Sequence, residues 1–150
     1  MRPPLKAITL HQPWASIIVG GHKTIENRSW RPDPSHIGSY IALHAGRTFD
    51  YFDAYLLHRK FGIFCDDAKC PTGAVIGVAL LLDVVEDSDD PWFCGPYGWL
   101  LQNVTPIKPV PCPGARGLWN VPEGVLTQIR TNYLEQHTSP PLNHGVRMSP

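Results

Sequence analysis

The stretch Gly21–Trp30, with the sequence GHKTIENRSW, places two cations around one carboxylate, directly after a short apolar segment. Glu26 and Arg28 are two residues apart, so on a β-strand they share one face, while Asn27 points to the other face. Lys23 lies in the turn that leads into this strand, within reach of the same face. Opposite charges packed so closely set each other's orientation and pKa, and such groups are enriched at functional sites. The same spacing is also compatible with a solvated surface turn.

The residues before this stretch predict a strand followed by a short helix. Residues 5–10 are short and apolar, as expected for a strand. Pro13 fits the first turn of a helix, where its missing N–H costs nothing. An apolar face with helical spacing follows, and two glycines at 20–21 end it; that face is formed by Trp14, Ile17 and Ile18.

Residues 10–30 as a whole resemble the opening of ASCH domains, which belong to the PUA-like superfamily of nucleic-acid-associated β-barrels. The family's Gln-Pro-Trp-Ala start stands at 12–15, and its G-x-K-x-x-E-x-R motif stands at 21–28. Later segments resemble the strands that follow in the family, in its bacterial and phage branch: 38–46, 73–83, 95–101 and 114–122. The resemblance covers roughly residues 5 to 122, with several motifs in the right order.

The resemblance implies an α+β fold, a small PUA-like β-barrel of five to six strands with two to three flanking helices. We expect this ASCH domain to span residues 1–137. The Pro-rich, polar segment 138–150 is expected to be a disordered tail.

The residue pattern predicts a similar set of elements without regular βαβ alternation. Ala74–Val85 is too continuously apolar for a surface strand and predicts a central strand buried on both faces. Because proline cannot donate to a strand ladder, residues 105–116 are expected to form an extended edge or loop, and residues 62–72 an irregular connection. The other expected strands are 24–30, 39–45, 97–104 and 117–121, and helices are expected after Thr48 and from Pro122.

Composition sets wide limits on function. The formal net charge of the 150 residues is zero, so no global field draws the protein to nucleic acid. Charge is nevertheless uneven, because residues 1–31 hold five Lys and Arg against one acid, whereas residues 83–90 hold five acids and no cation. The acidic run could gate access to the basic end if it lies nearby, or make the molecule dipolar if it lies far away. No apolar stretch reaches the roughly 18 residues that a membrane span needs, and the N-terminus lacks a signal-peptide core. We therefore expect a soluble, cytoplasmic protein.

The four cysteines do not predict a cofactor. They form no C-x-x-C pair, so the strong zinc and redox signatures are absent. Cys65 and Cys70 could supply two zinc ligands, completed by His58 or Cys94. Unpaired thiols are the commoner state in a reducing cytosol, and we expect neither metal nor cofactor.

By the resemblance, Lys23, Glu26 and Arg28 line a cleft beside the first helix, where PUA-like domains hold an RNA base or backbone. Lys23 offers a point charge to a phosphate or carbonyl. Arg28 could bind a ligand bidentately, or Glu26 could lock it as a structural pair, and both readings stay open.

Three further residues are candidate ligand contacts. Gln12, just before the helix, could read a ligand edge, and Trp30, before a Pro-rich loop, could stack a base. His44, at a predicted strand end, could donate to a ligand, act as a general base or simply cap a buried strand. Trp14 is assigned to the core, because it lies on the apolar face of its helix.

The resemblance, carried onto these residues, implies binding of RNA or a modified nucleoside, with a hydrolase as the alternative. The hydrolase would act on RNA phosphodiesters or on acetylated cytidine, with Lys23, Glu26 and His44 as catalytic groups. Some ASCH proteins are acetylcytidine amidohydrolases, which the resemblance describes as using this lysine, a threonine three residues later and a distant glutamate. Here the position three residues later is Glu26, Thr24 follows the lysine directly, and Glu86 is merely the nearest candidate for the distant acid. The sequence does not predict an oligomeric state.

Overall fold

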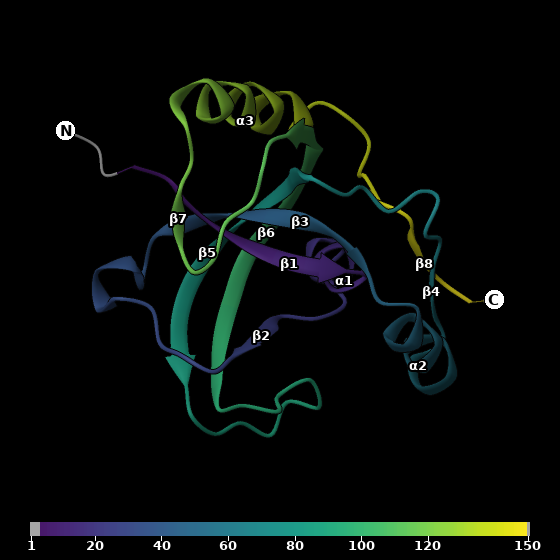
Figure 1. The fold of residues 1–150 in the computed structure, drawn as a ribbon. Coiled ribbons are helices and arrows are strands. Elements are labelled where there is room, and N and C mark those ends of the chain that lie inside the picture. Colours follow the sequence, from purple (N-terminus) through teal and green to yellow (C-terminus); the bar gives the residue numbers. More distant parts are fainter. Residues whose placement is uncertain (1–3, 150) are drawn as a thin grey trace.

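The computed structural model describes residues 4–149, which form an α+β fold with a six-stranded mixed sheet, a two-stranded sheet and three α-helices (Figure 1). The strands are β1 (Lys6–Gln12), β2 (Ile25–Arg28), β3 (Tyr40–Phe49), β4 (Ile63–Cys65), β5 (Ala74–Val85), β6 (Tyr97–Pro111), β7 (Trp119–Asn120) and β8 (Val146–Met148), and the helices are α1 (Trp14–Val19), α2 (Tyr51–Phe61) and α3 (Glu123–Gln136). The large sheet has the order β2-β6-β5-β3-β1-β7, and β4 pairs with β8.

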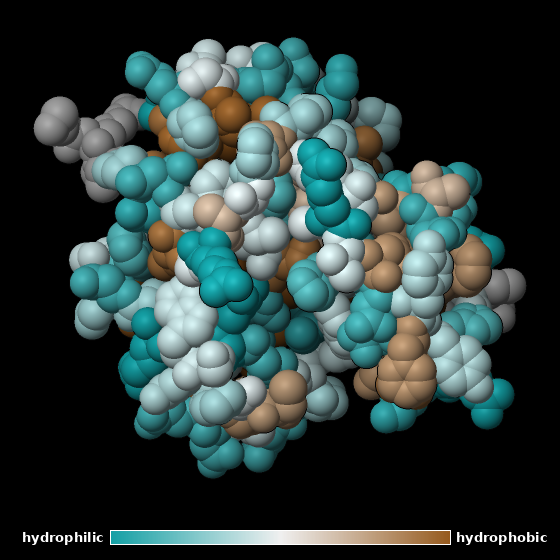
Figure 2. All heavy atoms as spheres, in the orientation of Figure 1, coloured by the Kyte–Doolittle hydropathy of each residue, from teal (hydrophilic) through white to brown (hydrophobic). Residues whose placement is uncertain are grey.

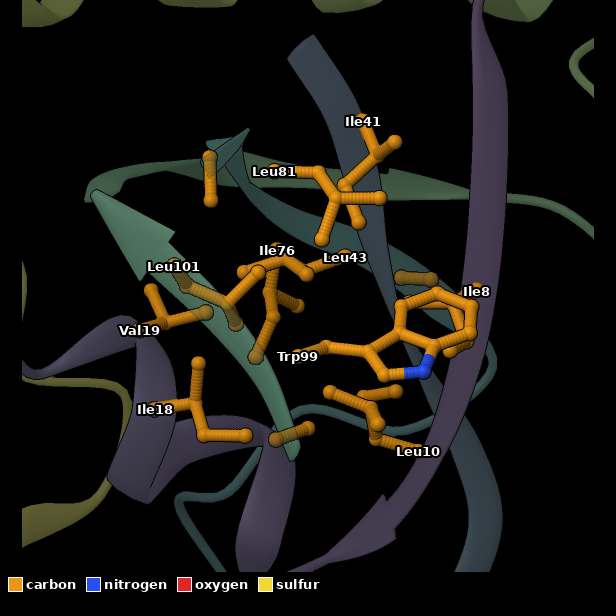
Figure 3. Packing of buried hydrophobic residues seen from close by; sticks show 14 of the residues in the cluster. Ile8, Leu10, Ile18, Val19, Ile41, Leu43, Ile76, Leu81, Trp99 and Leu101 are labelled. Atoms are coloured by element: carbon orange, nitrogen blue, oxygen red, sulfur yellow. The ribbon is translucent and has the colours of Figure 1, made fainter. Parts of the chain in front are cut away.

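The predicted central strand is confirmed. β5 spans Ala74–Val85 and pairs antiparallel with β3 on one side and with β6 on the other. Its continuous apolar sequence fits this position, since residues 74–79 are buried on both faces, whereas Leu82 and Asp83 near its end are exposed. In the largest core cluster Ile76 of β5 packs with Trp99, whose side chain is fully buried (Figure 3).

The predicted helix after Pro13 is also confirmed. α1 packs Ala15, Ile18 and Val19 into the same core. The C-terminal helix begins at Glu123 as predicted, and its Ile129 is buried in a second cluster on the opposite side of the sheet from α1's core. The two clusters therefore lie on the two faces of one sheet.

The sheet does not close into a barrel, so the strand and helix content of the expected fold is confirmed but closure is not. Within residues 4–149 no backbone ladder joins β2 to β1 or β7. β7 pairs only with Lys6 and Ala7 of β1, which leaves the outer edge of Thr9–Gln12 without a strand partner. The sheet nevertheless curves until β2 comes near β1 (Figure 1), close enough for the Arg28 side chain to donate to the Thr9 carbonyl oxygen.

The prolines after Val104 lie in an extended edge, which is one of the two alternatives expected for residues 105–116, and no loop interrupts the strand before Pro111. β6 continues to Pro111 and stays paired with β5 through several register shifts. β2 pairs only with residues 97–100 of β6. The far part of β6 is thus a free edge, where a proline without an N–H loses no ladder bond. On this edge the Asn132 side chain of α3 donates to the Lys108 carbonyl oxygen at 2.9 Å.

The segment 138–150, expected to be a disordered tail, contains the short strand β8 in the structure, and 62–72, expected to be irregular, contains β4. β8 pairs with β4, and Val146 is 4% exposed in a third small core cluster. His144 is also buried, and its Nε2 bonds to the carbonyl oxygens of Ile76 and Ile107. These contacts anchor a segment whose composition alone lacks the apolar residues to order it. Pro150 lies outside the described residues.

No helix of the described chain is both long and apolar enough to cross a membrane.

Candidate functional site

A cleft opens at the gap between the two unpaired strand edges, β1 and β2. Its volume is about 320 Å³. Its walls come from the end of β1, the first residue of α1, the turn before β2, and β2 itself; the lining residues are Thr9, Leu10, His11, Trp14, Lys23, Glu26, Asn27 and Arg28. The charged group that the sequence analysis singled out therefore borders a hollow, because backbone pairing stops there.

Glu26 lies between the two cations. Its Oε1 is 3.8 Å from Lys23 Nζ, and its Oε2 is 3.2 Å from Arg28 Nη2. Oε1 also accepts a hydrogen bond from the backbone N–H of Asn27. The Glu26 side chain is only 12% exposed, so water screens these contacts weakly. Each carboxylate oxygen is thus committed to a different cation, and the carboxylate holds both in place.

Lys23 is nearly buried, with an exposed fraction of 5%, yet it borders the cleft. Its Nζ lies 4.5 Å from the centre of the Trp14 ring, in a cation–π contact. Burial lowers the pKa of Lys23 below its usual value, and the nearby Glu26 carboxylate partly opposes this effect. The ammonium is therefore poorly hydrated and available to a polar guest in the cleft.

Arg28 connects the two strand edges. Its Nη2 donates to the Thr9 carbonyl oxygen at 2.9 Å and to Glu26. Its Nε has no hydrogen-bond partner among residues 4–149, although that atom is buried. A buried donor without a partner costs free energy, and a guest in the cleft can reach only the part of the Arg28 side chain that remains exposed, 24% of it.

Asn27 points to the other face of β2, as the alternation predicts. Its Oδ1 accepts from the backbone N–H groups of Cys94 and Gly95, and its Nδ2 donates to the Trp92 carbonyl oxygen. These hydrogen bonds hold residues 92–95 beside β2, and these residues are the end of the loop that carries the acidic run. The exposed pair between Glu86 and Arg31, at 3.7 Å, brings the start of that loop to the basic end of the chain as well. The acidic run therefore lies near the basic segment rather than far from it.

His44 is placed inside the sheet and does not line the cleft. It is 2% exposed, its Nε2 bonds to the Cys112 carbonyl oxygen at 2.8 Å, and its Nδ1 lies 3.2 Å from Thr9 Oγ1. Because Nε2 needs its proton for the carbonyl, Nδ1 accepts from the Thr9 hydroxyl, which in turn accepts from Trp119 Nε1. Burial lowers the pKa of His44. Its hydrogen bond with Thr9, which lines the cleft, is its contact with the site.

Gln12 and Trp30 are also set apart from the cleft. Gln12 is fully buried, where its amide accepts from the Ser16 N–H and donates to Ser16 Oγ and the Pro71 carbonyl oxygen. It thereby fixes the start of α1. Trp30 is half-buried and packs edge-on against Trp99, with ring centres 4.9 Å apart.

The chain is similar to a known domain family and to solved structures. The ASCH domain model matches residues 8–94, more than half of the chain. The chain belongs to the ASCH domain family. Crystal structures of ASCH from Zymomonas mobilis share its fold: the protein itself has 19% identity and a TM-score of 0.55 over 85% of this chain and 94% of that one. Two mutant forms of that protein match with 20% and 19% identity and the same TM-score, over 86% of this chain and 98% of theirs. No curated protein matches the chain in sequence.

Sequence reasoning missed part of this ASCH domain's cleft. Trp14 packs against the third core cluster, in line with its assignment to the core, but it also lines the cleft, with its ring 4.5 Å from Lys23 Nζ and its Nε1 donating to Asp53 Oδ2 at 2.8 Å. Its position at the helix start, beside the gap in the sheet, could be recognised only from the fold. Thr9 and His11 were not singled out, and no local motif marks them.

Two residues that bear on the amidohydrolase reading lie away from the cleft. Thr24 is exposed, and its carbonyl oxygen accepts from Leu101. Glu86 is 67% exposed and pairs with Arg31.

The four cysteines are free thiols. Cys65 and Cys70 pack in the small third cluster, and burial raises the pKa of Cys65 to about 12. Such a thiol keeps its proton at neutral pH. Among residues 4–149 no three His, Cys, Asp or Glu side chains converge in a way that could hold a metal ion.

Proposed function

We propose that this ASCH domain binds single-stranded RNA through one unstacked nucleotide, or a free modified nucleoside, in the cleft between β1 and β2. The observation that carries the proposal is the nearly buried Lys23 ammonium, held over Trp14 at the wall of an open cleft. A lysine on an ordinary solvated turn would have no reason to be desolvated and oriented in this way.

The shape of the cleft favours a single nucleotide. At about 320 Å³ it falls at the small end of ligand sites, of about 300–1,000 Å³. It can accept one base and its sugar but no duplex, and specific RNA recognition mostly targets such unstacked bases. Lys23 supplies a charge for a phosphate or base carbonyl, and the unused donors of Arg28 supply directional hydrogen bonds.

In this proposal Glu26 positions the two cations instead of binding the ligand itself. Both of its oxygens are already engaged. Of the two readings of Arg28 left open by the sequence, the structural pair with Glu26 is present, and a ligand contact through its remaining donors is compatible with it.

Hydrolysis is the second candidate, and the desolvated Lys23 favours it. Its lowered pKa raises the fraction of neutral amine, which can accept a proton from a water molecule that attacks a bound amide or phosphodiester. His44 would act on this reaction only through Thr9, since its own ring nitrogens are engaged.

The binding test compares two variants that remove the same charge. Lys23→Gln alters the cleft, and Lys60→Gln alters an exposed cation at the end of α2. With a fluorescein-labelled single-stranded RNA of mixed sequence, anisotropy should show affinity lowered about tenfold or more by Lys23→Gln, the loss of one charged contact. The salt slope should fall by about 0.7 if that contact is a phosphate. Equal losses in the two variants would refute the proposed cleft.

Turnover separates the two candidates. Purified protein is incubated with the same RNA and with acetylated cytidine, and products are followed by chromatography. Product formation that Lys23→Gln abolishes would establish the hydrolase. Retention of RNA without product would leave binding as the function.

A further inference from the structure

A second, larger hollow lies at the opposite end of β1 from the proposed RNA cleft. Its volume is about 920 Å³, and it runs between α3 and the first residues of β1 and β3. None of its lining residues lines the RNA cleft. In Figure 2 apolar surface shows beneath α3 at the top of the molecule, bordered by hydrophilic side chains.

The floor of this hollow is apolar. Ile41, Val78 and Ile129 are 1%, 6% and 2% exposed, and they come from β3, β5 and α3. Leu5 and Leu126 extend the apolar surface along its sides. The floor is thus assembled from buried core residues of three separate elements.

The rim is cationic. Lys6 and Arg130 both line the hollow, and neither pairs with a carboxylate among residues 4–149. No Asp or Glu belongs to the lining. Two uncompensated cations beside an apolar floor are complementary to a molecule with one anionic end and one apolar body.

We propose that this hollow is a binding site for an amphipathic anion, an acyl or aryl carboxylate whose apolar body lies on Ile41, Val78 and Ile129. Arg130 binds the carboxylate through its planar fork of donors, and Lys6 adds a second positive charge. The apolar body gains free energy by leaving water against the floor. The site is independent of the proposed RNA cleft, since the two share no residue.

The test uses decanoate as the probe, with decanol and decyltrimethylammonium as neutral and cationic chains of the same length. The two ions are kept below their micellar concentrations and decanol below its solubility limit. Isothermal titration calorimetry should show decanoate binding about tenfold more tightly than decanol, and the cation binding most weakly. Methyl NMR spectra should show shifts at Ile41, Val78 and Ile129.

The Lys6→Gln/Arg130→Gln variant removes the rim charges without touching the floor, and Arg59→Gln/Lys60→Gln removes two exposed cations from α2 as the matched control. We expect the first variant to bind decanoate and decanol equally, and the control to keep the preference for decanoate. Equal binding of the three chains to the unaltered protein, methyl shifts away from the floor, a preference that survives in the rim variant, or no binding of decanoate would each overturn the proposal.

Discussion

Replacing Glu26 with glutamine tests whether this carboxylate holds the cleft together. The substitution keeps the side-chain shape and removes the charge that lies 3.8 Å from Lys23 Nζ and 3.2 Å from Arg28 Nη2. Lys23 and Arg28 would then flank a neutral amide, with no anion between the two cations. We expect a clear loss of folding free energy.

The magnitude follows from burial. Removing one partner of a fully buried ion pair costs about 3–5 kcal/mol, because the remaining charge is left uncompensated. Here the Glu26 side chain is 12% exposed and that of Arg28 is 24% exposed, so water relieves part of the penalty. We therefore expect Glu26→Gln to lower the free energy of unfolding by about 2–3 kcal/mol, below the range for a fully buried pair.

Urea denaturation followed by tryptophan fluorescence measures this change. Glu86→Gln is the matched control, because it breaks the Arg31 pair, whose side chains are 49% and 67% exposed. Exposed pairs contribute little, so the control should stay within about 0.5 kcal/mol of the unaltered protein. Equal effects of the two substitutions, or an unfolding free energy unchanged by Glu26→Gln, would refute the view that Glu26 organises the cleft.

Two further predictions concern the framework around the site. Burial lowers the pKa of His144, so the unfolded chain takes up the proton first as pH falls. The stability that neutral His144 contributes is present above its usual pKa of about 6.5 and is lost as the pH falls below it. The urea midpoint should therefore drop between about pH 7.5 and pH 5, and it should drop less in His144→Gln. A midpoint that is equally sensitive to pH in that variant would contradict this prediction. A methyl group on Gly114 would lie 2.6 Å from Thr9 Oγ1, so Gly114→Ala should lower the unfolding free energy by about 1–3 kcal/mol. Gly124 lies in the first turn of α3 with open space around it, so Gly124→Ala should raise the unfolding free energy by about 0.5–1 kcal/mol. If both alanine substitutions changed the unfolding free energy in the same direction, the predicted crowding at Gly114 would be absent.

The elements with strong local patterns could be predicted from the sequence. β5 has the predicted bounds, because a continuous run of Val, Leu and Ile has few ways to be buried other than as a central strand. The side-chain directions of Glu26, Asn27 and Arg28 follow from strand alternation alone.

The rest depends on contacts between distant segments. Gln12 was interpreted as a ligand contact, but the carbonyl of Pro71, 59 residues away, completes its buried hydrogen bonds. His144 and Val146 contact β5, β6 and β4, and no local composition reveals these contacts of the C-terminal segment. The role of Trp14 in the cleft likewise exists only because pairing stops between β1 and β2.

The most direct test of the proposed RNA cleft is a map of backbone NMR shifts on adding a short single-stranded RNA. We predict that the largest shifts fall in two segments, 9–14 and 23–28, which the fold brings together at the cleft, and that Lys23→Gln abolishes them. Shifts confined to α2 or α3, with both segments unchanged at saturating RNA, would contradict the account.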